Sequence, residues 1–448
     1  MGKAFANGIL SIAAAIVLSS APGIGYAAVP AMHLAAVKGP SFYLKNGDRV
    51  VFYGDSITDQ RLYTTYIESY CITRFPKSHF TFVHSGWGGD RVTGGGGGPI
   101  DVRLKRDVLP YKPTVVTICL GMNDGSYRAF DQEIFDKYVS GYRHILDTLK
   151  MDLPHTRVTL LTAPAYDDVT RDPGFPGGYN ATLKKYGDAV ADLAKEYHAT
   201  LADTNAPLVE ALETAKTLEP DMAAKLIPDR VHPQHGGHMV MAAAVLKAWN
   251  APATVAEINI DIRGKSGRVS DHVNTKVKGL PKPKLGMAFT HLDEALPWPL
   301  DRDPEKNPDM QLALKSTDAE TTLNRFLLKI RGLPVGEYTI SVDGTEITKA
   351  TNEALGEGLD LAALPALPSN QQAKEVLGLV RKHNDLHFQR WRRVQFPVSK
   401  NNEAVPDDVK AQMDDLDKQE AEAVAALREA VIPKIHSIQV VRIVKEQP

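Results

Sequence analysis

The sequence predicts an α/β protein whose five-stranded parallel sheet is covered by helices on both faces, followed by a β-rich and helical C-terminal region. Between residues 48 and 250, short apolar strands alternate with longer amphipathic helices. This alternation is typical of a parallel sheet. Right-handed crossovers then place the loops that follow the strands on one edge of the sheet. We therefore expect the functional residues at that edge.

The predicted strands are short runs rich in apolar and β-branched residues. In chain order they are 50–53, 80–84, 114–120, 158–162 and, more weakly patterned, 200–203. The predicted helices are 61–75, 131–150, 179–198, 206–218 and 235–249. In helix 179–198, Leu183, Tyr186 and Val190 recur at helical spacing, which indicates that one side of this helix faces a core.

The pattern changes after residue 250, so we predict a first domain over 40–250 and a separate C-terminal region over 251–448. Strands are expected at 258–262, 326–330 and 338–343, and Asp343-Gly344 indicates a hairpin turn. Two helices, 370–392 and 406–431, follow. The sequence leaves three roles open for this region: a sugar-binding module, a dimer contact, or a cover over the first domain.

Composition excludes several classes of function. The chain has 448 residues, 43% hydrophobic and 24% charged, with a formal net charge of -2. It is long enough for two or three domains and a large core. The balanced charge gives no support for binding nucleic acid. Oligomeric state has no signature in the sequence.

The N-terminus has the pattern of an export signal over residues 1–27. Lys3 supplies a positive charge, 9–18 is apolar, and Gly25 and Ala27 are small residues at a cleavage site. The apolar part is too short to span a bilayer comfortably, and no other stretch approaches membrane length. We expect a secreted or periplasmic protein without membrane insertion.

The chain has two cysteines, Cys71 and Cys119. Both fall in apolar patterns, so we assign them to packing. A single disulfide is the alternative in an exported protein.

Ser56 follows the predicted strand 50–53 and the turn residues Gly54 and Asp55. A strand that ends in such a turn lifts the next side chain onto the carboxyl edge of the sheet. The N–H groups that open the following helix point at the same place and favour negative charge. Ser56 is therefore a candidate nucleophile. The alternative is that Ser56 only caps the helix.

Two further stretches follow the second and third strands. In Gly86–Arg91, glycines allow a backbone N–H to approach a ligand closely. In 121–124, Asn123 offers a neutral amide donor. The alternatives are a tight turn and an Asx turn. The five glycines at 94–98 lack the Lys-Ser/Thr of a phosphate-binding loop, so we interpret them as a flexible lip on the site.

Asp229 and His232 form the fourth stretch. A carboxylate three residues before an imidazole can accept the proton on Nδ1, which leaves Nε2 free to take a proton from a serine. His235 and His238 raise zinc binding as an alternative, but the spacing His-Glu-x-x-His is absent. Together these stretches predict acyl transfer, with Ser56, Asp229 and His232 catalytic. The N–H groups of Ser56 and Gly89 and the Asn123 amide are predicted to surround the oxyanion.

These four blocks resemble the SGNH (GDSL) hydrolase superfamily, over residues 48–250. Ser56 in Gly-Asp-Ser-Ile matches the nucleophile block, Gly89 the oxyanion glycine, Asn123 the third block, and Asp229 with His232 the Asp-x-x-His block. Gly88 is a rival for the oxyanion role. The resemblance implies a three-layer, flavodoxin-like fold, no metal or other cofactor, and ester hydrolysis.

An exported member with an added C-terminal region resembles the carbohydrate acetylesterases. The predicted substrate is an O-acetyl ester on a sugar or polysaccharide, and loop 166–179 is expected to contact sugar hydroxyls. The alternatives are a lipid or short-chain acyl ester hydrolase and a glycan-binding protein whose catalytic parts are vestigial.

Overall fold

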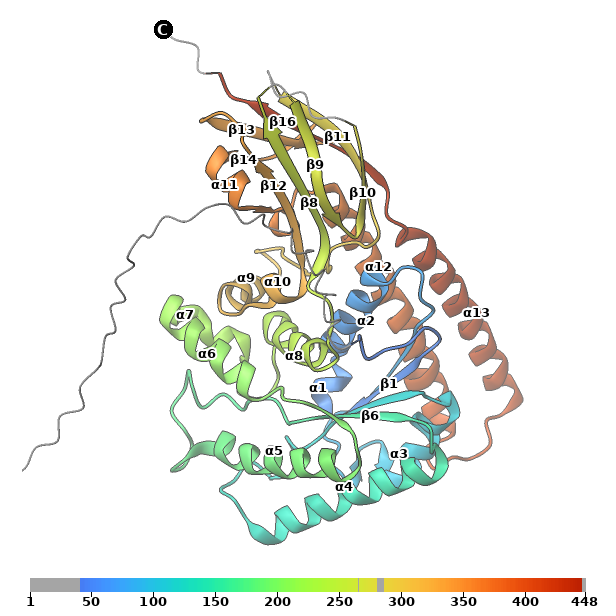
Figure 1. Cartoon of the computed structure of the whole chain (residues 1–448). Helices are drawn as coiled ribbons and strands as arrows, with labels where there is room; N and C mark the ends of the chain where they lie inside the picture. The colour runs from blue at the N-terminus through green and yellow to red at the C-terminus, as the bar shows by residue number, and fades with distance from the viewer. Residues whose placement is uncertain (1–40, 265, 280–285, 445–448) are drawn as a thin grey trace, which may run out of the picture. The chain divides into compact units, whose positions relative to one another are not determined.

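The computed structural model describes residues 41–264, 266–279 and 286–444 (Figure 1). The export signal predicted over 1–27 lies outside these residues. No helix in the described part of the chain is long and apolar enough to cross a membrane.

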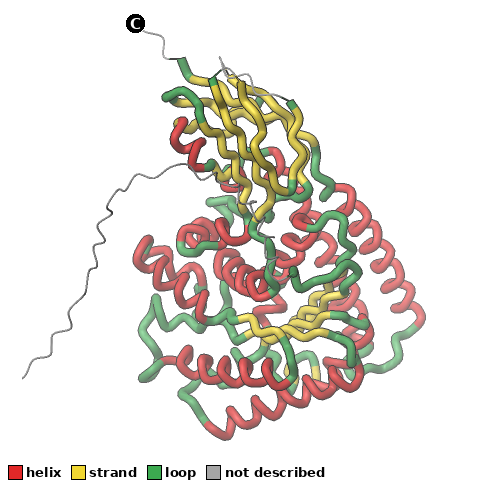
Figure 2. The backbone as a smooth tube through the Cα atoms, viewed as in Figure 1, coloured by secondary structure: helices red, strands yellow, loops and turns green. Residues whose placement is uncertain are grey.

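A five-stranded, all-parallel sheet organises the first half of the chain (Figures 1 and 2). Its strands are β1 (Arg49–Gly54), β2 (Thr81–Gly86), β5 (Val115–Cys119), β6 (Arg157–Leu161) and β7 (Thr200–Ala202). Their order is β2-β1-β5-β6-β7, the flavodoxin-like order. The five predicted strands are all confirmed.

Helices cover both faces of this sheet, because both faces of its strands are apolar. In β1, Val50 and Phe52 pack into one core, whereas Val51 and Tyr53 pack into another. The first core involves α2 (Leu62–Arg74), α6 (Ala206–Leu218) and α8 (His235–Ala248). The second involves α3 (Ile100–Asp107), α4 (Gln132–Asp152) and α5 (Gly178–Glu196). The predicted three-layer α/β/α fold is confirmed.

The register of the central strands aligns three functional loops. Gly54 at the end of β1 pairs with Gly86 of β2 and with Cys119 of β5. The segments after these residues contain Ser56, Gly89 and Asn123, so the sheet brings all three loops to one edge.

Strands of the C-terminal region form two further sheets. One has the order β15-β12-β8-β9 and the other β10-β11-β16-β13-β14. Ile258 and Phe326 from the first meet Phe289 and Ile438 from the second in one hydrophobic core. The bounds are β8 (Thr254–Arg263), β9 (Ser266–Val273), β10 (Thr275–Lys278), β11 (Gly286–Asp293), β12 (Arg325–Arg331), β13 (Glu337–Val342), β14 (Thr345–Thr351), β15 (Leu359–Asp360) and β16 (Ile435–Arg442).

The hairpin predicted at Asp343-Gly344 joins β13 to β14. Both turn residues have positive φ, 50° and 83°, as a type I′ turn requires. Short helices α9 (Pro308–Lys315), α10 (Ala319–Leu323) and α11 (Asn352–Glu357) fill the connections.

Two long helices close the chain, α12 (Pro368–Phe388) and α13 (Asp407–Ala430). Leu427 of α13 packs against Val376 and Val380 of α12. Asn384 of α12 donates to Thr65 of α2 at 2.9 Å, so this helix lies against the first domain. The chain from Phe42 onward forms one compact unit. After α12 the chain continues as a π-helical segment, η4 (Gln389–Gln395).

Both cysteines are buried and unpaired, as the packing assignment expects. Cys71 lies on α2 and Cys119 ends β5, and both belong to the same core. Burial raises the pKa of both thiols well above the usual value.

Candidate active site

Ser56 is the first residue of α1 (Ser56–Asp59), directly after β1. Asp55 is the N-cap, and its carboxylate accepts the Ile57 N–H at 3.0 Å. The alternative in which Ser56 caps the helix is therefore wrong. A Cβ at Gly54 would lie 2.6 Å from the Cys119 carbonyl oxygen, so only glycine fits this sharp exit from the strand. Burial raises the pKa of Asp55 to about 8.

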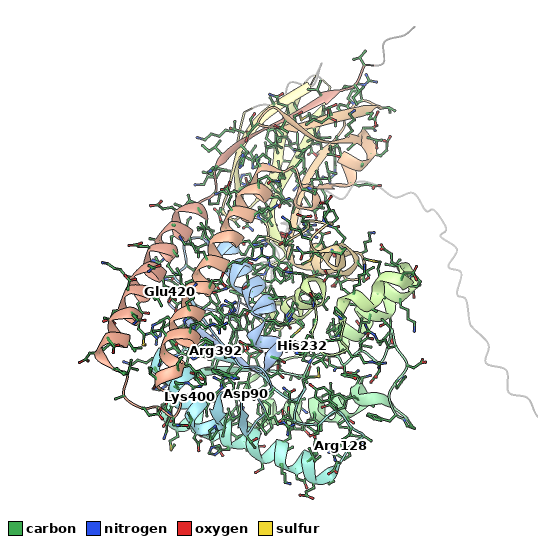
Figure 3. All side chains as sticks on the ribbon, turned by 180° about the vertical axis from the view of Figure 1, so that it is seen from behind. Asp90, Arg128, His232, Arg392, Lys400 and Glu420 are labelled. Carbon is green, nitrogen blue, oxygen red and sulfur yellow. The ribbon has the colours of Figure 1, made fainter. Side chains whose placement is uncertain are left out.

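His232 lies beside Ser56 although 176 residues separate them in the chain. Its Nε2 is 2.8 Å from the Ser56 Oγ, and its Nδ1 is 2.6 Å from the Asp229 Oδ2. Because a carboxylate only accepts, Nδ1 carries the proton, and Nε2 accepts the Ser56 hydroxyl. The structure thus brings the predicted Ser56, His232 and Asp229 together (Figure 3 marks His232).

Asp229 is held ionised by its own turn. Partial burial opposes ionisation, but hydrogen bonds from His232 and Val231 outweigh this and lower the pKa of Asp229. Arg230 lies in the same turn and has a positive φ of 72°. The Arg230 guanidinium donates to the Asp172 carbonyl at 2.8 Å, which ties the loop to the segment after β6.

The two other histidines of this stretch have protein partners. His238 Nδ1 accepts the Tyr63 N–H at 3.2 Å, so its Nε2 donates to Gln60 Oε1 at 3.1 Å. Gln60 in turn donates to the Pro233 carbonyl at 3.4 Å, next to His232. His235 Nδ1 is 2.8 Å from the Tyr66 hydroxyl. Across the described ranges, no three His, Cys, Asp or Glu side chains group as metal ligands.

The predicted oxyanion donors lie at the same sheet edge. Within the described part of the chain, the N–H groups of Ser56 and Gly89 have no acceptor in the protein. The rival Gly88 donates its N–H to Asp59 Oδ2 at 3.2 Å, so it is not free for a substrate. Asn123 donates from Nδ2 to the Asp90 carbonyl at 3.0 Å, which uses one of its two amide protons.

Tyr127 orients the Asn123 amide and was missed by sequence reasoning. Its hydroxyl donates to Asn123 Oδ1 at 2.9 Å, which directs the NH₂ group toward Asp90. Ser126 and Tyr127 have φ values of 56° and 55°, and this tight turn presents Tyr127 back to Asn123. Asn123 and Tyr127 lie in a loop whose residues show no helical pattern, so the sequence held no signal for this contact.

The glycine run forms a short hairpin in place of the expected flexible lip. Strands β3 (Gly94–Gly95) and β4 (Gly98–Pro99) pair with each other. A Cβ at Gly97 would lie 2.6 Å from Arg103 and 2.7 Å from Trp87. Close packing against these two side chains therefore explains the glycine at position 97, and a Cβ at Gly95 would in the same way lie 2.7 Å from Asp90.

The C-terminal region contributes side chains close to this edge, which sequence reasoning also missed. Arg392 of η4 (Figure 3) lies 3.2 Å from Asp59 Oδ2. Trp391 is buried and donates to Asp107 at 2.6 Å. These η4 residues thus cover part of the first domain, which is one of the three roles that the sequence left open for the C-terminal region.

Comparison with known proteins identifies the family of the first domain. Residues 52–240 match the model of the GDSL-like lipase/acylhydrolase family. These residues form a GDSL-like acylhydrolase domain. The acetylxylan esterase of Geobacillus stearothermophilus is 29% identical over 222 residues, which are 45% of this chain and 94% of that protein. The protein is a carboxylic ester hydrolase of the GDSL type.

A solved structure matches most of this acylhydrolase, including its C-terminal region. The structure of a gut microbial diltiazem-metabolizing enzyme aligns with a TM-score of 0.77 and 25% identity. The alignment covers 89% of this chain and 98% of that structure. The arrangement of an acylhydrolase domain with this C-terminal region is therefore shared with another protein.

Proposed function

We propose that the protein is an exported serine esterase that removes O-acetyl groups from a carbohydrate. The observation that carries the proposal is the contact of His232 Nε2 with Ser56 Oγ at 2.8 Å, with Asp229 on the opposite ring nitrogen. This arrangement suits proton transfer from a hydroxyl that attacks an ester.

In the first half of the reaction, Ser56 Oγ attacks the ester carbonyl carbon and His232 Nε2 takes the hydroxyl proton. The tetrahedral intermediate collapses, and the sugar oxygen leaves with the proton that His232 returns. Water then attacks the acetyl-Ser56 ester, with His232 again as base and then acid, which releases acetate. Asp229 stabilises the imidazolium in both halves.

The carbonyl oxygen gains negative charge in both tetrahedral intermediates. The N–H groups of Ser56 and Gly89 and the second amide proton of Asn123 are free to bind it, since no protein acceptor in the described residues takes them. Ser56 also begins α1, whose N-terminal end favours negative charge.

Three observations favour a carbohydrate as the alcohol part. Tyr127 is 42% exposed next to Asn123, and its ring is 6.2 Å from that of Tyr166. Aromatic rings of this kind stack on the apolar faces of sugars. Loop 166–179 adds exposed polar side chains such as that of Asp172, whose carbonyl binds Arg230 of the Asp229–His232 turn. An acetylxylan esterase is also among the similar proteins.

Export is proposed from residues 1–27 alone, whose charge and apolar pattern are those of a signal peptide. Acetylated plant polysaccharide is too large to cross a membrane, so an esterase for it would act outside the cell. Fractionation of cells that express the full chain, with N-terminal sequencing of the mature protein, tests this point.

A second candidate is hydrolysis of a small, non-carbohydrate ester. The observation that favours it is the likeness to a diltiazem-metabolizing enzyme over 89% of this chain.

Acetate release from acetylated xylan, compared with p-nitrophenyl esters of increasing chain length, separates these functions. We expect release from xylan and a preference for acetyl over longer acyl groups. Activity on p-nitrophenyl acetate without release from any acetylated glycan would favour the small-ester function. A preference for long acyl chains would contradict both.

The Ser56→Ala variant tests the chemistry. It should lose hydrolysis by a factor of about 10⁵ or more while its unfolding curve stays unchanged. Unchanged hydrolysis would move the nucleophile elsewhere in the chain.

A further inference from the structure

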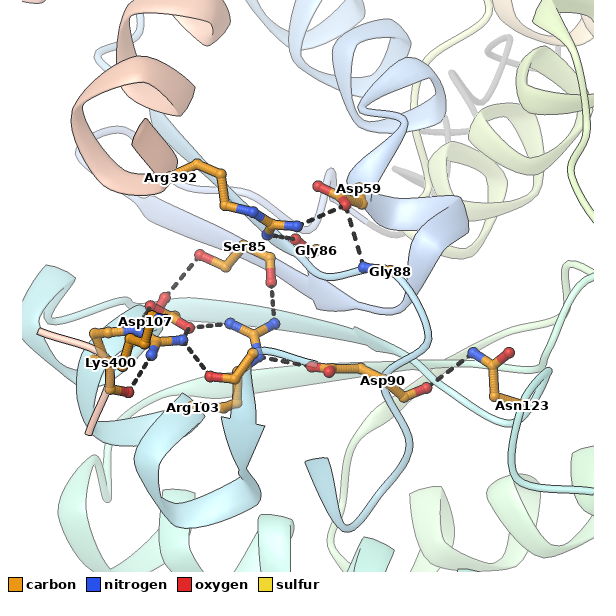
Figure 4. Close-up of polar contacts among 12 residues, drawn as sticks. Asp59, Ser85, Gly86, Gly88, Asp90, Arg103, Asp107, Asn123, Arg392 and Lys400 are labelled. Atoms are coloured by element: carbon orange, nitrogen blue, oxygen red, sulfur yellow. Dashed lines mark hydrogen bonds and ion pairs between the residues drawn. The ribbon is translucent and has the colours of Figure 1, made fainter. Parts of the chain in front are cut away.

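The loop that carries Gly89 is held by Asp59 of α1, which in turn contacts Arg392 of the C-terminal region (Figure 4). Asp59 Oδ2 accepts the Gly88 N–H at 3.2 Å, one residue before Gly89. Gly88 and Gly89 are exposed and have no side chain, so backbone hydrogen bonds hold this part of the loop. Two of these bonds run to backbone carbonyls, from Trp87 to Gly54 and from Asp90 to Trp87. Asp59 is the side chain that accepts from the loop, directly before Gly89.

Arg392 of η4 holds Asp59 and the loop together. Its Nη2 is 3.2 Å from Asp59 Oδ2, and its Nη1 is 3.5 Å from the Gly86 carbonyl oxygen. Its guanidinium carbon lies 3.1 Å from the centre of the Trp87 ring, in a cation–π contact. Arg392 thus contacts two residues of the loop, Gly86 and Trp87, and it also contacts Asp59, which accepts the Gly88 N–H.

Arg392 also neutralises a charge that would otherwise oppose catalysis. Asp59 carries a carboxylate next to the peptide group of Gly88, whose neighbour Gly89 is proposed to bind the oxyanion. A carboxylate without a counter-ion would repel the developing negative charge. The side chains of Arg392 and Asp59 are only 16% and 22% exposed, so water screens this pair weakly.

A second route leads from η4 to Asn123. Trp391 Nε1 donates to Asp107, and Asp107 is bound by Arg103. The Nε of Arg103 donates to Asp90 Oδ2 at 2.6 Å (Figure 4). The Asp90 carbonyl accepts from the Asn123 amide. Asp90, Arg103 and Asp107 are buried, so this network between η4 and the site is shielded from water.

We propose that Arg392 is a positioning residue for ester hydrolysis, through which the C-terminal region completes the oxyanion hole. The proposal rests on the proposed roles of Ser56, Gly89 and Asn123. It assigns to the C-terminal region a catalytic contribution beyond covering the first domain.

The test uses Arg392→Met in the full chain, with Arg390→Met as the matched control. Arg390 lies on the same segment, but it contacts Asp417 and Gln395 and not the loop. Hydrolysis of p-nitrophenyl acetate is measured per active site, and the concentration of active sites is determined by titration with a fluorophosphonate. We expect Arg392→Met to lower kcat by about 10- to 100-fold with KM within about threefold, because misplaced oxyanion donors act in the transition state. Arg390→Met should stay within about twofold of the wild type.

Two further readouts separate positioning from a merely structural role. Methylboronic acid forms a tetrahedral adduct on the serine, so its Ki should rise as kcat/KM falls. Adding Asp59→Asn to Arg392→Met should recover part of the lost kcat, because the asparagine amide oxygen still accepts the Gly88 N–H and the side chain carries no charge. Arg392→Lys should fall between the wild type and Arg392→Met.

An unchanged kcat per active site in Arg392→Met, together with an inactive Ser56→Ala, overturns this inference alone. A double variant that loses more activity than Arg392→Met also overturns it. Activity that persists in Ser56→Ala instead removes the proposed function, and this inference with it.

Discussion

Asp229 binds His232 at two points: Oδ1 accepts the His232 backbone N–H at 2.7 Å, and Oδ2 faces Nδ1 at 2.6 Å. The two hydrogen bonds fix both the position of the ring and its tautomer. The proton on Nδ1 leaves Nε2 as the acceptor for Ser56. The turn from Asp229 to His232 therefore orients the imidazole so that Nε2 can accept the Ser56 proton.

Asp229→Asn should lower kcat by about 10²- to 10⁴-fold, in the range of a lost general base. Asparagine retains an oxygen for the backbone N–H, but its NH₂ group would then face Nδ1. Nδ1 becomes an acceptor, the proton moves to Nε2, and Ser56 loses its base. Steady-state kinetics on p-nitrophenyl acetate measure the effect. Asp192→Asn, at an exposed ion pair on α5, is the control.

Tyr127→Phe should lower kcat by about 2- to 10-fold, the value of one neutral hydrogen bond. Without the hydroxyl, the Asn123 amide is free to turn its oxygen toward the site. KM for acetylated glycans should change less, because phenylalanine keeps the aromatic face. Tyr197→Phe removes an exposed hydrogen bond to Asp147 and serves as the control. An equal loss in both variants would contradict the role given to Tyr127.

Gly86→Ala should destabilise the protein by about 2 kcal/mol or more. A Cβ at Gly86 would lie 2.2 Å from the Asp59 backbone nitrogen and 2.4 Å from the Thr58 carbonyl carbon, where no flexible side chain can yield. Gly88→Ala should cost only about 0.5 kcal/mol, because its nearest neighbour is 3.8 Å away. Urea unfolding of both variants tests the contrast, and equal losses would contradict it.

A buried cluster links α2 to the C-terminal helices and predicts a pH dependence of stability. His383 lies 3.2 Å from Glu68 and 3.0 Å from Glu420. Burial alone would lower the pKa of His383, but the two carboxylates raise it to about 10. Burial likewise opposes ionisation of Glu68, but His383 and His84 lower its pKa to about 2.

The ordinary pKa is 6.5 for histidine and 4.5 for glutamate, so His383 is shifted up and Glu68 is shifted down. The raised pKa of His383 stabilises the fold fully below pH 6.5, and this stability is lost as the pH rises toward 10. The lowered pKa of Glu68 stabilises the fold above pH 4.5 and is lost toward pH 2. The cluster therefore stabilises most between pH 4.5 and 6.5.

His383→Gln should reduce the free energy of unfolding by about 3 kcal/mol at pH 6, because two buried carboxylates lose their counter-ion. The difference from the wild type should shrink as the pH approaches 10. Urea titrations at pH 6, 8 and 9.5 measure it. His144→Gln, at an exposed pair with Asp101, should show no such trend. If the free energy of unfolding of His383→Gln and of the wild type changed with pH in the same way, the charge assigned to His383 would be wrong.

Local sequence determined the acylhydrolase fold and the residues that meet at its edge. Runs such as 50–53 are apolar on both faces and alternate with helices, which is typical of a parallel sheet covered on both sides. Ser56 and Asn123 follow predicted strands, so the topology alone placed them at one edge of the sheet. Asp229 and His232 are instead predicted from their own three-residue spacing and from the family resemblance. The contact of Ser56 with His232 bears this out.

The tertiary structure decided what surrounds these residues. Arg392 meets Asp59 across 333 residues, and Trp391 meets Asp107 across 284. Such contacts follow from how η4 packs on the first domain, and no periodicity or spacing encodes them. The turn that returns Tyr127 to Asn123 depends on positive φ at non-glycine residues, which neighbouring packing enforces. Short-range pattern thus specified the reacting groups, whereas long-range packing specified the groups that hold them in place.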